Sequence, residues 1–229
     1  MFAALPLPQP QRRLDPRPHD LIFWSGLTED IKAATAESAG LPSWINVGWP
    51  VVLRRAPFVS AGAWLPVGLR GSTRSQRCAA FLSTTAISAI VTPESLIPVA
   101  ALASDDALPA LITLRQITKL MCDLGLVWGP TGGVGFALAS GAAVVRGDSD
   151  LDLLVRSPAP LNSEQIQLLQ QVQSGATLCR IDIQVDTGHG GFAFSEFQRS
   201  ATSVLLKTSR GPMIVSDPWS YQTEVGAAL

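Results

Sequence analysis

The chain is short of histidine, cysteine and net charge. It contains two histidines and three cysteines in 229 residues, at His19, His189, Cys78, Cys122 and Cys179. They are too few and too far apart for the ligand spacing of a zinc site. Seventeen Lys and Arg against eighteen Asp and Glu give a net charge of -1, without the basic excess of a protein that holds long nucleic acids. We therefore expect neither His- or Cys-based metal chemistry nor a nucleic-acid partner.

A long uninterrupted apolar run is also missing. The most apolar stretch, residues 79–103, is broken by Pro93, Glu94 and Pro98, whereas a membrane-spanning helix needs about 20 apolar residues in succession. The amino terminus lacks the charged-then-apolar order of a secretory signal and holds five prolines by residue 18. We expect a disordered tail over residues 1–17, no membrane partner, and a cytoplasmic location, which also suits the odd number of scattered cysteines.

The rest of the chain is long enough for two modest domains. In the first, the patterns predict helices over 28–39, 75–83 and 93–102, the last capped by Thr92, and strands over 51–56 and 64–71. A polar break at residues 104–106 follows. We therefore predict a small N-terminal α+β domain over residues 18–104 and a second domain over residues 105–229.

The second domain alternates helices and strands. Apolar residues recur at the helical period from Leu108 to Leu124, and Gly125 closes this long helix. The patterns then predict helices over 134–141, 164–174 (capped by Ser163) and 192–199, and strands over 126–129, 151–155, 179–185 and 203–211. The predicted class is α+β overall, with an α/β second domain built on a mixed sheet.

Two carboxylates stand close together where the 151–155 strand begins. Side chains alternate along a strand, so Asp150 and Asp152 project from one face and the leucines between them from the other. Like charges at that separation raise one another's pKa unless a cation lies between them. Mg²⁺ suits such a pair, because it accepts one or two carboxylates and keeps its other positions for phosphate oxygens and water.

Two simpler interpretations compete with a magnesium site. The acidic segment also matches the first ligands of a calcium-binding EF-hand loop, but Leu153 and Ala159 stand where that loop needs Gly and Glu. The other alternative is a merely acidic, solvated start of a strand. The glycine pair Gly132-Gly133, between a strand and a helix, favours the magnesium site, because backbone N–H groups at a helix start bind phosphates.

A third carboxylate is expected on a neighbouring strand, because two metal ions in one site need a further ligand. Asp182, flanked by apolar residues in the next predicted strand, is the candidate, and Asp186 is the alternative. We therefore predict that Asp150, Asp152 and Asp182 hold the metal and form the catalytic centre.

This combination resembles the nucleotidyltransferase superfamily, in which a glycine pair precedes a strand with Asp-x-Asp and a later strand carries a third acid. Within that superfamily, the segment WGPTGGVGFALASGAAVVRGDSDLDLLV, residues 128–155, is similar to the phosphoribosyl-dephospho-CoA transferases, also called malonate decarboxylase holo-acyl-carrier-protein synthases. Residues 17–24, 50–56 and 65–82 resemble the N-terminal domain of the same family. The resemblance covers nearly the whole chain beyond the tail.

The resemblance implies a transfer from triphosphoribosyl-dephospho-CoA to a serine of the acyl-carrier subunit of malonate decarboxylase, with release of pyrophosphate. Two Mg²⁺ ions held by the three carboxylates would polarise the α-phosphorus and steady the leaving pyrophosphate. Asp182 could also act as general base on the serine. The chain departs from the family pattern at Gly133, where the family has Ser, and at Thr131, where an apolar or aromatic residue is usual.

Several cations are candidates for binding the donor, together with Gly132 and Gly133. Arg180 lies two residues before Asp182. Lys207 and Arg210 lie at the end of the last predicted strand. A merely solubilising role on the surface is the alternative for each of them.

Arg70, Arg74 and Arg77 form a denser set of cations. Arg74 and Arg77, three residues apart, could share one face of a helix. We predict that this set binds the phosphates of the donor or an acidic carrier protein.

Two other functions stay open at this point. An ATP-dependent nucleotidyltransferase that acts on another protein or on a small molecule would have the same metal site. An inactive nucleotidyltransferase-like module would only bind a partner, but it would have no reason to keep three mutually repelling carboxylates.

Overall fold

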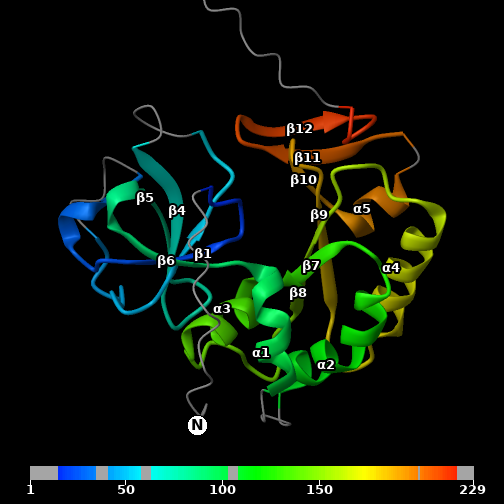
Figure 1. The fold of residues 1–229 in the computed structure, drawn as a ribbon, viewed down its shortest axis with the longest axis horizontal. Coiled ribbons are helices and arrows are strands. Elements are labelled where there is room, and N and C mark those ends of the chain that lie inside the picture. The colour runs from blue at the N-terminus through cyan, green and yellow to red at the C-terminus, as the bar shows by residue number, and fades with distance from the viewer. Residues whose placement is uncertain (1–14, 35–40, 58–62, 103–107, 201, 221–229) are drawn as a thin grey trace, which may run out of the picture.

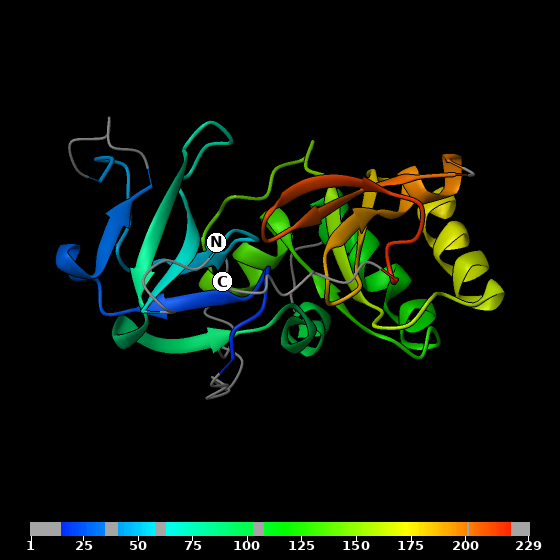
Figure 2. The ribbon, with the colours of Figure 1, turned by 90° about the horizontal axis from the view of Figure 1, so that it is seen from above.

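The structure is a computed structural model with two halves, each built on a six-stranded sheet (Figure 1). It describes residues 15–34, 41–57, 63–102, 108–200 and 202–220. The two sheets lie side by side along the long axis of the molecule (Figure 2). Helices and strands are both abundant, so the α+β class is confirmed. Most of the predicted tail and the predicted domain boundary at residues 104–106 lie outside the described residues.

The N-terminal half is an antiparallel sheet in the order β2-β5-β4-β3-β1-β6. Its strands are β1 (Leu21–Trp24), β2 (Ile31–Ala33), β3 (Val51–Leu53), β4 (Trp64–Arg70), β5 (Arg77–Ser83) and β6 (Ile87–Val91), with 3-10 turns η1 (Thr28–Asp30) and η2 (Thr84–Ala86) between them. One face buries Ile22, Val67 and Leu82 in a core of this half alone. The other face carries Leu21 and Val52, which pack against the C-terminal half.

Two helices predicted in this half are wrong. Residues 28–30 form only a 3-10 turn and β2 follows at once, while residues 35–40 lie outside the described part of the chain. Residues 77–83 form β5 instead of a helix. Ala80 and Leu82 are buried and their neighbours are less so, which is the two-residue period of a strand, and β5 pairs with β4 along its whole length.

The C-terminal half combines helices with a mixed sheet in the order β12-β11-β10-β9-β8-β7, in which only β8 and β9 are parallel neighbours. Its elements are η3 (Pro93–Leu96), α1 (Ile97–Leu102), α2 (Pro109–Cys122), β7 (Val127–Pro130), α3 (Gly132–Ser140), β8 (Leu151–Arg156), α4 (Ser163–Gly175), β9 (Ile181–Asp186), β10 (Gly191–Ala193), α5 (Phe194–Arg199), β11 (Val204–Thr208) and β12 (Gly211–Val215). The predicted mixed sheet is therefore confirmed. None of the helices within the described ranges is long and apolar enough to cross a membrane.

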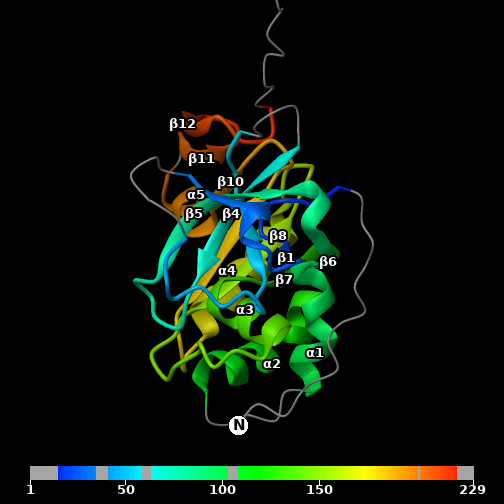
Figure 3. The same cartoon turned by 90° about the vertical axis from the view of Figure 1, so that its left-hand side faces the viewer.

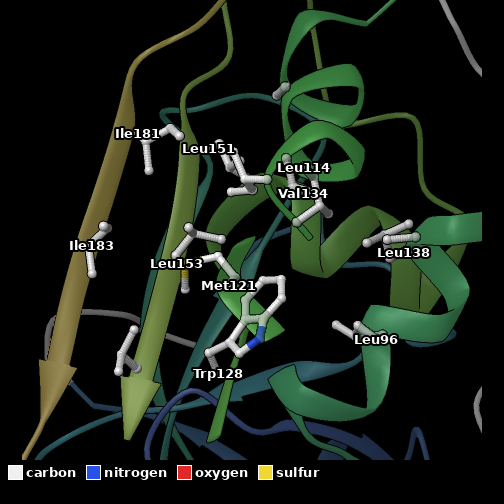
Figure 4. Close-up of a cluster of buried hydrophobic side chains, with 14 of the residues drawn as sticks. Leu96, Leu114, Met121, Trp128, Val134, Leu138, Leu151, Leu153, Ile181 and Ile183 are labelled. Carbon is white, nitrogen blue, oxygen red and sulfur yellow. The ribbon is translucent and has the colours of Figure 1, made fainter. Parts of the chain in front are cut away.

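The main core fixes the orientation of β8 and β9. Leu151, Leu153, Ile181 and Ile183 are buried on these strands in the same core as Trp128 (Figure 4). Because side chains alternate along a strand, the residues between them point to the opposite face. That alternation turns the acidic residues of both strands away from the core.

The start of α4 and the last strand differ from the predictions. Asn162, not Ser163, caps α4 in a capping box: its Oδ1 accepts from the backbone N–H of Gln165 at 2.8 Å, and the Gln165 side chain accepts from Asn162 N–H at 3.0 Å. The sequence pattern also missed β12, whose residues are mostly exposed at the edge of the sheet.

A buried network of charges joins the two halves. Arg156, on β8, is 8% exposed and donates to Asp20 beside β1 at 3.1 Å and to Asp186 at the end of β9 at 3.0 Å. Arg55, just after β3, also pairs with Asp186 at 3.0 Å. Because buried charges need partners, these contacts tie the N-terminal sheet to the C-terminal one.

Candidate active site

The two central strands of the C-terminal sheet bring the predicted carboxylates together. In the parallel pairing of β8 with β9, Asp152 lies directly opposite Asp182, and neighbouring strands are about 4.8 Å apart. Asp150 comes just before β8 and is exposed, whereas Asp152 and Asp182 are half-buried. The structure therefore gathers the three residues at one place, on the face that the helices leave uncovered.

Asp152 is the carboxylate that this arrangement perturbs most clearly. Burial, then the negative charges of Asp182 and Asp150, raise the pKa of Asp152, while Arg77 and Arg70 act in the opposite direction. A group held between like charges gains from any cation that enters. The geometry thus favours a positive ligand or a proton at Asp152.

Arg180 holds Asp182 in place. Its Nε donates to Asp182 Oδ1 at 2.9 Å, and a second bond from Nη2 reaches Oδ2. This pair raises the pKa of Arg180 and occupies both oxygens of Asp182. Each oxygen of Asp182 keeps a further lone pair for a cation or a proton, and the exposed Arg180 side chain competes with such a ligand.

The turn into α3 lies against the same carboxylates. Thr131 N–H donates to the backbone oxygen of Asp152 at 2.8 Å. Gly132 has a positive φ of 57°, and a Cβ atom there would overlap the Asp152 carboxylate. Gly133 is half-buried beside the Arg70 guanidinium. The first N–H groups of α3, which have no partner within the helix, therefore start next to the carboxylates, where they can donate to phosphate oxygens.

The N-terminal half supplies the cations. Arg70 and Arg77 lie opposite each other in the antiparallel pairing of β4 with β5, so two like charges face each other across the strands. Burial and the Arg77 charge lower the pKa of Arg70. Arg74, in the turn between these strands, donates to the backbone oxygen of Asp148 at 3.1 Å. The structure thus brings all three predicted arginines to the site, but on a β-hairpin and not on a helix.

Part of this site forms a polar cavity of about 270 Å³, whose lining does not include Asp182, Arg180 or Gly132. Its walls include Arg70, Arg74, Arg77, Gly133, Asp150 and Asp152, together with Arg146 and Ser149. Sequence analysis missed Arg146, although its position four residues before Asp150 was a usable signal. Arg146 N–H donates to Ser149 Oγ at 2.9 Å, which shapes the loop that leads into β8.

Some predicted residues lie elsewhere. Lys207, on β11, and Arg210, in the turn before β12, are not among the residues that line this cavity. Asp186, the alternative third ligand, lies at the far end of β9, where it pairs with Arg156 and Arg55. The parallel register places Asp186 opposite Arg156, four residues beyond the Asp152–Asp182 pair.

Asp150 and Asp152 offer oxygen ligands of the kind that suit Mg²⁺. Among the described residues, no group of three or more His, Cys, Asp or Glu side chains is arranged to hold a metal ion, which agrees with the engagement of Asp182 by Arg180. Asp150 and Asp152 line the polar cavity, and Mg²⁺ typically uses one or two carboxylates plus phosphates and water. Their hard oxygen donors and the raised pKa of Asp152 match that ion.

Comparison with known proteins covers both halves of the chain. Residues 17–93 match the family model for the phosphoribosyl-dephospho-CoA transferase MdcG N-terminal domain, and residues 96–218 match that for the MdcG C-terminal domain. Proteins named phosphoribosyl-dephospho-CoA transferase are similar in sequence: one from Pseudomonas putida is 42% identical over 90% of this chain and 96% of its own length, and one from Klebsiella pneumoniae is 37% identical over 89% and 96%. No solved structure matches the chain.

Proposed function

The chain belongs to the phosphoribosyl-dephospho-CoA transferase family, and from that premise we propose that it transfers phosphoribosyl-dephospho-CoA from triphosphoribosyl-dephospho-CoA to a serine of the acyl-carrier subunit of malonate decarboxylase. The observation that supports a phosphoryl-type transfer is that Asp150 and Asp152 share one polar cavity with Arg70 and Arg77 of the other half, while Asp182 lies beside Asp152 on the adjacent parallel strand. Negative and positive groups are both needed there, to hold a metal and a polyphosphate.

In this proposal the cations and the start of α3 bind the triphosphate. Arg70, Arg77 and Arg146 neutralise its charge, and the backbone N–H groups at Gly133 donate to its oxygens. Asp150 and Asp152 would hold Mg²⁺, which neutralises charge that develops on the phosphates during transfer. This is nucleotidyltransferase chemistry, in which the protein acts mainly by positioning and by electrostatic stabilisation.

The reaction needs one proton acceptor. The serine Oγ attacks the α-phosphorus, the bond from that phosphorus to the bridging oxygen breaks, and pyrophosphate leaves. Asp182 accepts the serine proton at a carboxylate oxygen, and the hydrogen bonds from Arg180 orient that carboxylate.

Incubation of the protein with labelled triphosphoribosyl-dephospho-CoA, the apo acyl-carrier subunit and Mg²⁺ tests the proposal. We expect the label on the carrier, a matching mass increase, and no label on a carrier whose acceptor serine is replaced by alanine. Transfer from ATP to the carrier or to another acceptor would point instead to a general nucleotidyltransferase. Absence of transfer from any donor, with the protein folded, would contradict an enzymatic role.

A further inference from the structure

A second cavity opens beside the polar one, between the two halves. It measures about 350 Å³, within the range of about 300–1,000 Å³ that small-molecule sites occupy. Apolar groups make up most of its lining. The buried ring of Phe136, from α3, forms part of one wall and the N-terminal sheet forms the other. Figure 3, in which the N-terminal half faces the viewer, shows β4 and β5 above α3.

On the sheet side of this cavity, short side chains leave space for a ligand. Val52, Gly68 and Ala79 lie in one row across β3, β4 and β5, paired directly with one another. A glycine inside a strand often marks a place where a ligand approaches the backbone. A Cβ atom at Gly68 would make only an ordinary contact, 3.5 Å from the Arg54 side chain. The glycine therefore leaves space and does not relieve a clash.

Arg70 and Arg77 form the border between the two cavities, since both residues line both of them. Their charges face each other across the strand pair, and the buried Nε of Arg70 has no hydrogen-bond partner among the described residues. Two opposed cations with an unused donor call for an anion between them. A ligand that fits both cavities therefore has a phosphate at this border and an apolar, planar group on the Phe136 side.

We propose that the cavity beside Phe136 binds the adenine nucleoside of the dephospho-CoA group, with a phosphate of the same molecule between Arg70 and Arg77. This inference rests on the proposed function for the identity of the donor. It goes further because it assigns the interface between the halves as the site that recognises the base.

The lining favours adenine over the pantetheine arm. Arg54, Arg70 and Arg77 can only donate hydrogen bonds, and the ring nitrogens of adenine accept them, while guanidinium groups also attract the face of an aromatic ring. Arg70 already lies over the Phe136 ring, 5.4 Å from its centre. His19 completes the lining. Burial and the Arg55 charge lower the pKa of His19 to about 4, so its neutral ring can accept from the exocyclic amine.

Binding of donor fragments tests the site without catalysis. By calorimetry on the full chain, we expect dephospho-CoA and ADP to bind, and phosphopantetheine, which lacks adenine, to bind at least tenfold more weakly. Ala79→Leu fills the space beside Gly68 and should weaken dephospho-CoA binding at least tenfold, while inorganic triphosphate binds as in the wild type. Ala89→Leu, on the edge strand β6 and outside the cavity lining, is the matched control.

If Ala79→Leu fails to fold, Gly68→Val blocks the same space from the neighbouring strand. Unchanged dephospho-CoA affinity in a folded cavity-filling variant, or no binding of dephospho-CoA to the wild type, would overturn the assignment. The carrier-labelling assay tests the proposed function independently of these binding measurements. If dephospho-CoA binding depends on Ala79 but no transfer to the carrier occurs, the nucleoside site is supported and the proposed function is rejected. If transfer occurs but Ala79→Leu leaves dephospho-CoA binding unchanged, the proposed function is supported and the nucleoside site is rejected.

Discussion

Asp152 is half-buried between two other carboxylates, Asp182 and Asp150. Its ionised form is therefore disfavoured in the protein without a bound cation. Asp152→Asn removes that charge and keeps the shape of the side chain, so we expect the melting temperature to stay equal or to rise. Transfer activity should fall by about 10²–10³-fold, because a preorganised charge is lost from the reacting centre.

Asp123→Asn, at the exposed end of α2, is the control for Asp152→Asn. Both changes remove one carboxylate, but Asp123 lines neither cavity. Thermal unfolding and carrier labelling on the two variants separate stability from activity. Activity of Asp152→Asn within tenfold of the wild type would contradict the role of Asp152.

His19 makes stability depend on pH. Burial, then Arg55, lower its pKa to about 4, from about 6.5, with Asp186 opposing and Arg156 and Lys207 adding to the shift. Between these values the unfolded chain binds a proton that the folded protein does not, so His19 stabilises the fold above pH 6.5 and this contribution is lost as pH falls toward 4. The loss should be about 2 kcal/mol at pH 5.

The contribution of Asp20 to stability changes with pH in the opposite direction to that of His19, over the same pH range. Burial raises the pKa of Asp20 to about 6, despite the Arg17 N–H and Arg156, so its contribution is present at low pH and is lost as pH rises through 6. The effect of His19 is therefore measured as the difference in stability between the wild type and a variant that lacks His19. Asn tolerates the positive φ at position 19. In urea unfolding, the His19→Asn variant should lose less stability than the wild type from pH 7 to pH 5. Equal losses of stability in the variant and in the wild type over this pH range would contradict the prediction.

At the scale of elements, α3 has a glycine with positive φ at each end. Gly132, at the start, has φ 57°, and Gly141, at the end, has φ 70°. Alanine at either position incurs a similar backbone strain, on the order of 1–2 kcal/mol. A Cβ atom at Gly141 meets nothing within 4 Å, whereas at Gly132 it overlaps the Asp152 carboxylate.

The matched pair Gly132→Ala and Gly141→Ala therefore isolates that overlap. We expect both variants to lose stability in urea unfolding and only Gly132→Ala to lose most of its transfer activity, because Asp152 must move. Equal activity in the two variants would show that the close approach of α3 to β8 has no part in the reaction.

The sequence predicted those elements whose pattern is local. The alternation around Asp150 and Asp152 and the helical period from Leu108 to Leu124 were sufficient for β8 and α2. Residues 75–83 were assigned wrongly, because a run of alanine and leucine suits a helix and only the distant pairing with β4 makes it a strand.

The same reasoning explains which site residues were found. Arg70 and Arg77 were singled out as a cluster, but they meet through strand pairing, which sequence spacing does not reveal. The Asp20–Arg156 contact joins residues 136 positions apart and had no local signal. Lys207 was placed near the donor because it follows a strand, but that strand ends away from the polar cavity.

At the scale of the whole molecule, one buried arginine connects the halves. Arg156→Met removes the charge that Asp20 and Asp186 share, and leaves two buried carboxylates with fewer partners. We expect a loss of about 3–5 kcal/mol in the free energy of unfolding. Arg180→Met breaks an Arg–Asp pair of similar geometry at an exposed position, where solvent screening should make the loss much smaller. Urea unfolding of both variants checks the contrast, and similar losses would contradict it.

The contact between Asp20 and Arg156 can form only late in synthesis of the chain, because its two residues are far apart in the sequence. A ribosome adds about 5–20 residues per second, so the 136 residues between these partners correspond to about 7–27 s of synthesis. During that interval β1 has left or is leaving the ribosome, while the arginine that neutralises its neighbouring carboxylate has not been made. We therefore expect the ion pair that joins the two halves to form only after β8 has been synthesised.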